Sequence, residues 1–221
     1  MDLLEVGPGA GAISKYLLKI PEINYKAIEI DTEKVDYLTK TYPDIEGKLI
    51  NIDFLKASIP FENNFSVIGN FPYNISSQIL FIILDWQAQV TEVIGMFQKE
   101  VAQRVAAKEG SKTYGILSVL IQCFFKVEYL FDVHENCFTP PPKVKSGVIR
   151  LSNLHNPYDI DDFAKFSSMV KAAFGQRRKT LRNALKARIK QEDITNSIFD
   201  KRAEQLSVSD FVKLYNDFFK Q

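Results

Sequence analysis

Short apolar runs alternate with amphipathic stretches over the first two thirds of the chain. The runs have the length of buried strands, and they cover residues 3–6, 27–30, 48–52, 66–68, 92–97 and 145–151. Helical patterns fill the intervals, at residues 13–18, 34–40, 79–84 and 98–108. A longer apolar stretch follows at 117–131. Strands that alternate with helices predict an α/β fold, a mostly parallel sheet with helices on both faces.

The last third of the chain has only helical patterns. They cover residues 161–174, 178–189, 195–199 and 209–219. Residues 153–158, which are polar and contain Pro157, have the character of a linker. The sequence therefore predicts a first domain at 1–152 and a small all-helical domain at 159–221.

Composition places the chain among globular proteins. Of its 221 residues, 46% are hydrophobic and 25% are charged, which excludes a disordered chain. No stretch approaches 18 uncharged apolar residues, so we expect no transmembrane helix. Two cysteines, Cys123 and Cys137, are too few for a disulfide framework, and we expect a cytoplasmic setting.

The near-neutral net charge of +1 conceals a basic segment. Residues 171–190 contain eight basic side chains and no acidic one. Arg178, Arg182 and Lys186 recur every four residues, which predicts a helix with one cationic face. A solvated face is the usual explanation of such a pattern, but no acid lies at i±4 to relieve the repulsion, so we favour contact with a polyanion. The candidate residues for this contact are Lys143, Arg177, Arg178, Lys179, Arg182 and Lys186.

Three alternate glycines follow the first predicted strand. Gly7, Gly9 and Gly11 permit a tight turn and the close approach of a ligand, although a plain strand-to-helix turn would look the same. Their spacing differs from the G-x-G-x-x-G of dinucleotide folds. Glu29 and Asp53 end the next two predicted strands, where they can meet a ribose and an adenine amino group. The combination favours an adenosyl ligand without phosphates at the carboxyl edge of the sheet.

A tetrad of Asn70, Phe71, Pro72 and Tyr73 follows the fourth predicted strand. It resembles the tetrads of methyltransferases that act on exocyclic amino groups. The strings at 74–77, 97–104, 114–119, 138–144 and 176–182 narrow the resemblance. Together these motifs resemble the ribosomal RNA adenine dimethyltransferases, from Leu4 to near Phe218.

The resemblance implies a Rossmann-like class I methyltransferase sheet and a reaction. S-adenosyl-L-methionine would donate methyl groups to N6 of two adjacent adenosines near the 3′ end of small-subunit ribosomal RNA, in an immature subunit. The Asn70 side chain and the Pro72 carbonyl would accept hydrogen bonds from the amine, with Tyr73 as the third catalytic residue. Residues expected at the substrate base are Phe71, Tyr73 and Phe138. Residues expected at the cofactor are Glu5, Gly7, Gly9, Gly11, Glu29, Ile30, Asp53, Phe54 and Asn70.

Several alternatives stay open at this point. They are a large-subunit adenine methylase of the macrolide-resistance type, an assembly factor that binds RNA without methylating it, and a nicotinamide-dependent dehydrogenase. The family usually has a leading segment that closes over the donor, whereas Met1 here directly precedes the first strand, which favours the assembly factor. We expect no metal, no catalytic histidine, no membrane contact and a monomer.

Overall fold

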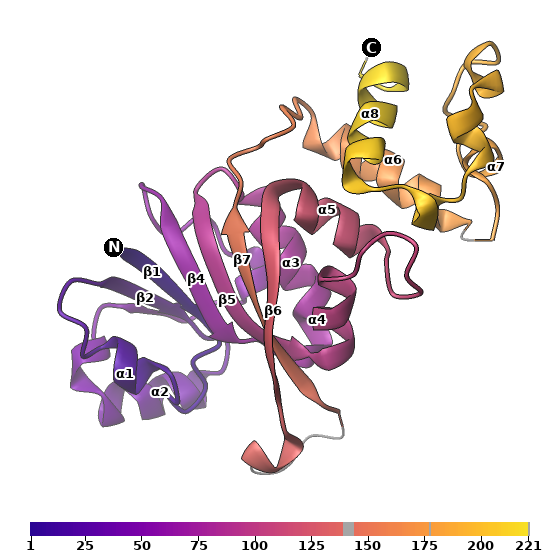
Figure 1. Cartoon of the computed structure of the whole chain (residues 1–221). Coiled ribbons are helices and arrows are strands. Elements are labelled where there is room, and N and C mark those ends of the chain that lie inside the picture. Colours follow the sequence, from indigo (N-terminus) through magenta and orange to yellow (C-terminus); the bar gives the residue numbers. More distant parts are fainter. Residues whose placement is uncertain (139–143, 177, 221) are drawn as a thin grey trace. The chain divides into compact units, whose positions relative to one another are not determined.

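The computed structural model describes residues 1–138, 144–176 and 178–220, and its strands form one seven-stranded sheet (Figure 1). The spatial order of the strands is β3-β2-β1-β4-β5-β7-β6. Their bounds are β1 Asp2–Val6, β2 Asn24–Ile28, β3 Leu49–Ile50, β4 Phe65–Asn70, β5 Val90–Gln98, β6 Phe125–Val133 and β7 Ser146–Asn153.

The sheet confirms the predicted α/β fold and adds antiparallel pairing at β7. β1 lies between β2 and β4 and is parallel to both, and β4 is parallel to β5. β7 runs antiparallel to β5, with Gln98 opposite Ser146. Parallel neighbours end at the same edge of a sheet, so the carboxyl ends of β1, β2 and β4 lie side by side.

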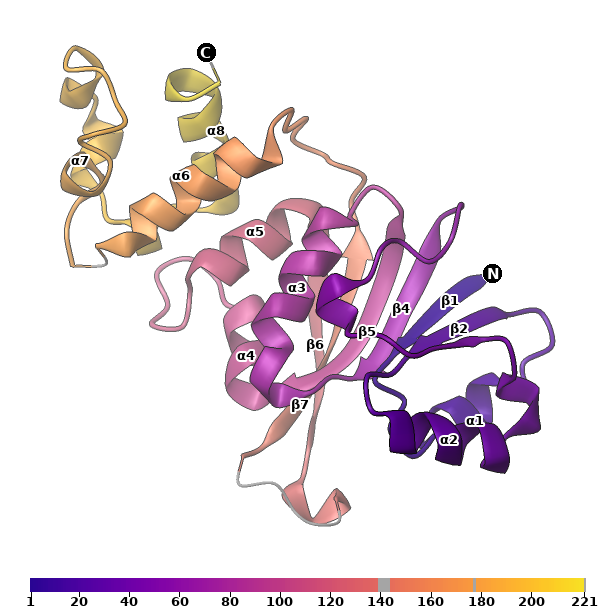
Figure 2. The same ribbon diagram turned by 180° about the vertical axis from the view of Figure 1, so that it is seen from behind.

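Most of the α-helices bury apolar residues. Their bounds are α1 Ser14–Leu17, α2 Thr32–Thr41, α3 Ser76–Asp85, α4 Lys99–Val105, α5 Ile116–Phe124, α6 Phe163–Gly175, α7 Leu181–Ala184 and α8 Val208–Phe218. Asp31 caps α2 by accepting hydrogen bonds from two backbone N–H groups of its first turn. Leu38 of α2 then packs with Tyr25 and Ala27 of β2 in a buried cluster. α3 lies behind β5 in Figure 1 and in front of it in the reverse view of Figure 2.

The predicted helix over 178–189 is wrong in extent. Only Leu181–Ala184 is α-helical, and residues 186–188 form turns. Thr180 provides no side-chain cap, and Leu185 leaves the helical region at φ −107° and ψ 3°. The Leu181 N–H instead donates to the Lys201 carbonyl at 2.8 Å. A residue 20 positions further along the sequence therefore fixes the backbone at Leu181. Arg178, Arg182 and Lys186 therefore do not share a continuous helix face.

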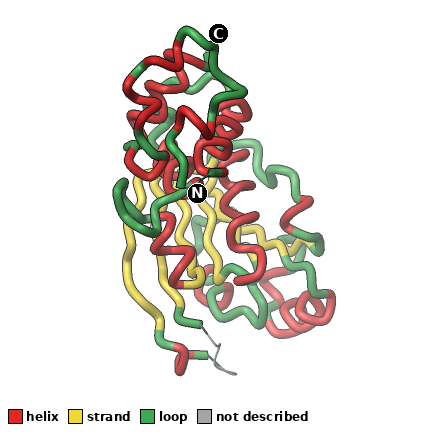
Figure 3. Tube along the Cα trace, turned by 90° about the vertical axis from the view of Figure 1, so that its right-hand side faces the viewer, coloured by secondary structure: helices red, strands yellow, loops and turns green. Residues whose placement is uncertain are grey.

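The chain forms two compact units. One comprises residues 1–102 and 126–153, and the other comprises 103–125 and 154–221. The second unit therefore combines α5 with the C-terminal helices, and the described part of the chain after β7 is drawn only as helix and loop in Figure 3. The domain boundaries drawn from the sequence, 1–152 and 159–221, stay a proposal. Among the described residues, no helix has both the length and the apolar character needed to cross a bilayer.

Candidate functional site

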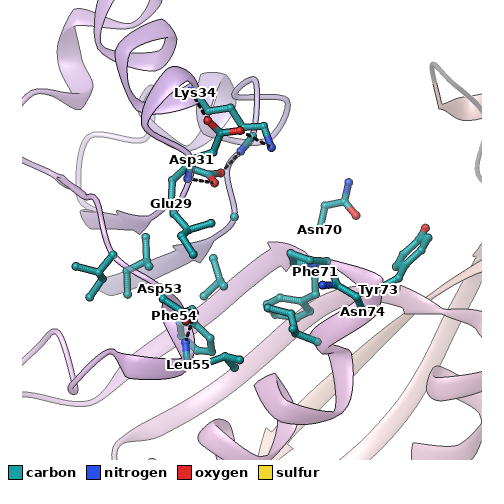
Figure 4. Close-up of a pocket in the computed structure, with 18 of the residues that line it drawn as sticks. Glu29, Asp31, Lys34, Asp53, Phe54, Leu55, Asn70, Phe71, Tyr73 and Asn74 are labelled. Carbon is teal, nitrogen blue, oxygen red and sulfur yellow. Dashed lines mark hydrogen bonds and ion pairs between the residues drawn. The ribbon is translucent and has the colours of Figure 1, made fainter.

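A cavity of about 700 Å³ opens at the carboxyl edge of the sheet, entirely within the first compact unit (Figure 4). Most of the residues that the sequence singled out line it. They are Gly7, Gly9, Glu29, Ile30, Asp53, Phe54, Asn70, Phe71, Pro72, Tyr73 and Phe138. Further lining residues that the sequence did not single out include Asp31, Lys34, Ile52, Asn74 and Ile75.

The glycine turn forms the wall next to the tetrad. Gly7 and Gly9 adopt φ angles of +68° and +60°, which side chains with a Cβ rarely tolerate. The Gly7 N–H donates to the Ile28 carbonyl at 2.9 Å, so the turn is tied to the end of β2. A Cβ on Gly7 would lie 3.7 Å from Pro72 Cδ. The turn after β1 therefore contacts the tetrad after β4.

Glu29 lies directly after β2 and is 6% exposed. Its Oε2 accepts a hydrogen bond from the Gly9 N–H at 3.0 Å, and its Oε1 accepts one from the Asp31 N–H at 3.1 Å. A carboxylate has about four acceptor sites, so two remain for a ligand. Glu29 thus fixes the glycine turn and keeps acceptor capacity at the pocket wall.

Asp53 lies three residues beyond the end of β3, at the start of a short 3₁₀ helix at Phe54–Lys56. Its Oδ1 accepts a hydrogen bond from the Leu55 N–H at 2.9 Å. Asn51, which sequence reasoning missed, donates to the backbone carbonyls of Glu29 and Ile30 at 2.8 and 3.2 Å. Asn51 therefore ties the chain after β3 to the chain after β2, and both acids face one pocket.

Two members of the predicted cofactor set lie outside the pocket lining. Glu5 is 1% exposed, and its Oε2 accepts hydrogen bonds from Ser14 Oγ at 2.7 Å and from the Tyr25 hydroxyl at 2.5 Å. Burial raises the pKa of Glu5, and these two hydrogen bonds oppose the shift. Gly11 packs against α2, where a Cβ would lie 2.5 Å from the Tyr42 ring. Glu5 and Gly11 therefore support the glycine turn from outside the pocket lining.

The tetrad begins with an available amide. Figure 4 shows the Asn70 side chain pointing into the open pocket. It is exposed, and within the described part of the chain no hydrogen bond uses it. The Pro72 carbonyl, the second predicted acceptor, already accepts hydrogen bonds from the Ile75 N–H and from Ser76 Oγ, both at 3.3 Å. These bonds begin the short helix at Tyr73–Ile75.

The aromatic residues of the site have different surroundings. Phe71 is 1% exposed, and its ring packs 4.8 Å from the ring of Phe97, so it forms the floor of the pocket. Tyr73 is half-buried, and its hydroxyl hydrogen-bonds Ser146 Oγ on β7. Phe138 is half-buried and lines the same pocket.

The predicted RNA-binding residues belong mostly to the second compact unit. Arg178, Lys179 and Lys186 are exposed there. Arg182 pairs with Asp200 at 2.5 Å, so its charge is partly balanced by an acid that the local sequence pattern did not reveal. Lys143 and Arg177 lie outside the described residues. No group of three or more His, Cys, Asp or Glu side chains is placed to hold a metal in the described ranges.

Comparisons with known proteins agree on one family. A sequence model described as ribosomal RNA adenine dimethylase matches residues 1–220. Two proteins named ribosomal RNA small subunit methyltransferase A are similar over 218 residues. The one from Cytophaga hutchinsonii is 53% identical and covers 97% of this chain and 84% of its own, and the one from Flavobacterium johnsoniae is 54% identical and covers 96% and 83%.

Solved structures give the same fold. A dimethyladenosine transferase from Plasmodium falciparum aligns with a TM-score of 0.82 at 24% identity, over 98% of this chain and 90% of its own. The 23S rRNA methyltransferase ErmE aligns with a TM-score of 0.68 at 22% identity, over 96% and 90%. At these identities the two structures support the Rossmann-like methyltransferase fold and nothing finer.

Proposed function

The chain belongs to the ribosomal RNA adenine dimethylase family, and we propose that it transfers methyl groups from S-adenosyl-L-methionine to N6 of two adjacent adenosines near the 3′ end of small-subunit ribosomal RNA. The observation that carries this proposal is the tetrad, whose exposed Asn70 amide opens on the same pocket as Glu29 and Asp53. The two relatives at 53% and 54% identity carry a small-subunit name, which favours that RNA over the large-subunit one.

The pocket suits an adenosyl donor without phosphates. Glu29 and Asp53 offer carboxylate acceptors for ribose hydroxyls and for an adenine amino group. Lys34, a basic residue in the lining, pairs with Asp31 at 3.6 Å. Gly7 and Gly9 let the backbone approach the ligand closely, with Ile30 and Phe54 beside them as apolar contacts. S-adenosyl-L-methionine supplies an electrophilic methyl group on a sulfonium sulfur.

Asn70 would orient the amine that attacks this methyl group. The adenine amino group is a weak nucleophile because its lone pair is delocalised into the ring. Hydrogen bonds accepted from both of its N–H groups favour a pyramidal nitrogen. Asn70 Oδ1 is one acceptor, and a tetrad carbonyl is the second. The Phe71 carbonyl is the stronger candidate, because the Pro72 carbonyl already accepts two hydrogen bonds.

The target base must leave its stack to reach the pocket. That step costs on the order of a few kcal/mol. Stacking on an aromatic face returns about 1–3 kcal/mol per base. Tyr73 and Phe138 are half-buried in the lining and can present such faces, whereas the buried Phe71 supports them from the floor. Positioning of this kind can account for roughly 7–11 kcal/mol of a reaction barrier.

The exposed cations of the second unit would bind the RNA backbone. Arg178, Lys179 and Lys186 are exposed and within reach of a polyanion. Arg182 contributes less in this proposal, because Asp200 already balances it. We further propose that the chain acts as a monomer, in the cytoplasm, on an immature small subunit.

Mapping of modified adenosines tests the proposal directly. The chain is incubated with labelled S-adenosyl-L-methionine and immature small subunits, and the methylated positions are mapped. Two adjacent dimethyladenosines near the 3′ end of the RNA are expected. Binding to the subunit without methylation would identify an assembly factor instead, and label on large-subunit RNA would identify the other methylase class.

A further inference from the structure

The tetrad is anchored at several points along its length. Asn70 is the last residue of β4 and lies opposite Met96 in the ladder, and the Phe71 N–H donates to the Met96 carbonyl at 3.1 Å. Phe71 packs on Phe97. These contacts fix the backbone of Asn70 and Phe71. They do not fix the ring of Tyr73, whose orientation depends on its hydroxyl group.

That hydroxyl group meets a residue on another strand. The Tyr73 hydroxyl hydrogen-bonds Ser146 Oγ, the first residue of β7. Ser146 is completely buried, whereas Tyr73 is half-buried. A buried hydroxyl needs a partner, so this hydrogen bond satisfies Ser146 and tethers the phenol at once.

The backbone on both sides of Ser146 is held as well. Ser146 pairs with Gln98 at the end of the β5–β7 ladder, and the Lys99 N–H donates to the Lys145 carbonyl at 2.8 Å just beyond it. The hydroxyl of Ser146 therefore projects from a fixed point of the backbone. The Tyr73 phenol is therefore tied to the sheet through Ser146, a short way along the chain from the backbone anchors at Asn70 and Phe71.

We propose that Ser146 is a positioning residue for methyl transfer: its hydroxyl holds the Tyr73 ring in one orientation at the pocket, so that the incoming base meets a preset aromatic face. This inference rests on the proposed function. Without the tether, the half-exposed phenol can hydrogen-bond water in other orientations. The base would then have to select one orientation during stacking, which lowers the population that reacts.

Two single variants and their combination test the tether. Ser146→Ala and Tyr73→Phe each remove it, and loss of one neutral hydrogen bond predicts a kcat about 3- to 10-fold lower. The double variant should be no slower than either single one, because both remove the same interaction. The affinity for S-adenosyl-L-methionine, measured by calorimetry, should stay unchanged. Ser66→Ala is the matched control, because it removes a hydroxyl pair with Thr91 at 3.1 Å elsewhere in the same sheet.

A spectroscopic measurement reads the same property without methyl transfer. 2-Aminopurine at the target position of a small-subunit RNA fragment loses fluorescence when it stacks on an aromatic ring, and Ser146→Ala should weaken that quenching. Quenching and kcat at wild-type level, or losses that multiply in the double variant, would overturn the role of Ser146. A wild-type chain that binds the donor but methylates no RNA would overturn the proposed function, and the quenching would still decide the role of Ser146.

Discussion

The Oε2 atom of Glu29 accepts a hydrogen bond from the Gly9 N–H at 3.0 Å, and this contact joins the end of β2 to the turn after β1. One carboxylate therefore shapes the glycine turn and presents acceptors to the pocket. Glu29 and the glycine turn, which the sequence suggested as separate features, therefore form one connected structure.

Glu29→Ala should weaken donor binding strongly. The change removes the ribose acceptor and leaves the N–H groups of Gly9 and Asp31 without their partner, at about 1–3 kcal/mol for each orphaned group. We expect donor affinity to fall by roughly 10- to 100-fold in calorimetry. Glu33→Ala, at an exposed acid in the first turn of α2, is the control. Equal affinity in wild type and Glu29→Ala would remove Glu29 from the site.

Asn70→Ala should abolish methyl transfer and preserve RNA binding. Its amide is exposed in the pocket, so removing it costs little stability, but the amine loses one preorganised acceptor. We expect turnover to fall by about 100-fold or more, by comparison with the loss of other preorganised polar groups. RNA affinity should match that of the wild type. Asn63→Ala, at an exposed asparagine outside the pocket lining, should turn over normally. Unchanged turnover in Asn70→Ala would refute the acceptor role.

Gly95→Ala should destabilise the protein through Phe71. A Cβ at Gly95 would lie 2.1 Å from Phe71 Cε2, so the ring must shift. Overpacking of this kind costs about 1–3 kcal/mol in the free energy of unfolding. The smaller side chain of Phe71→Leu should recover part of that loss, so the double variant is more stable than the sum of the single effects predicts.

Urea denaturation measures these differences. Gly175→Ala is the control, because a Cβ there meets nothing within 4 Å. Strict additivity of Gly95→Ala and Phe71→Leu would show that the two sites do not share the packing described above.

Glu5→Gln should change the pH dependence of stability. Burial raises the pKa of Glu5 in the folded state above its unfolded value of 4.5, so ionisation of this group opposes folding. The stability contributed by the protonated form is complete below pH 4.5 and is lost as the pH rises through the folded pKa. The Tm of Glu5→Gln should therefore rise relative to that of the wild type as the pH increases above 4.5. A Tm difference that is constant with pH would contradict this, and Glu46→Gln, at an exposed acid, is the control.

Neutralising Arg178 and Lys179 together should reduce the salt dependence of RNA binding. Each lost phosphate contact lowers the slope of log Kobs against log[salt] by about one unit. Lys213→Gln changes an exposed lysine of α8 outside the basic segment and should leave the slope unchanged. Equal slopes for all three proteins would exclude the residues around position 178 as the RNA surface.

Much of the site followed from local sequence. Strands such as β1 and β4 are visible as short, mostly apolar runs, and the glycines, Glu29 and Asn70 mark the points near which strands end. The burial of Phe71 was also detectable in principle, because Gly69 and Gly95 leave room for a large ring beside them.

The remaining features depend on contacts between distant residues. The pairing of Arg182 with Asp200 spans 18 positions, and a period of four among the cations cannot reveal it. The same period of four predicted a helix over 178–189. It carries no information on the hydrogen bond from the Leu181 N–H to the Lys201 carbonyl, which takes the place of a bond within such a helix. The tie between Tyr73 and Ser146 spans 73 positions and depends on strand order, which the hydrophobic pattern does not encode.

β7 is the last strand of the sheet in the sequence, yet it lies between β5 and β6. During translation, the glycine turn and the tetrad leave the ribosome long before residue 146 does. β6 can take its final place only together with β7, since β7 separates it from β5. An elongating chain therefore holds its ligand-binding elements early and acquires the hydrogen-bond partner of Tyr73 late.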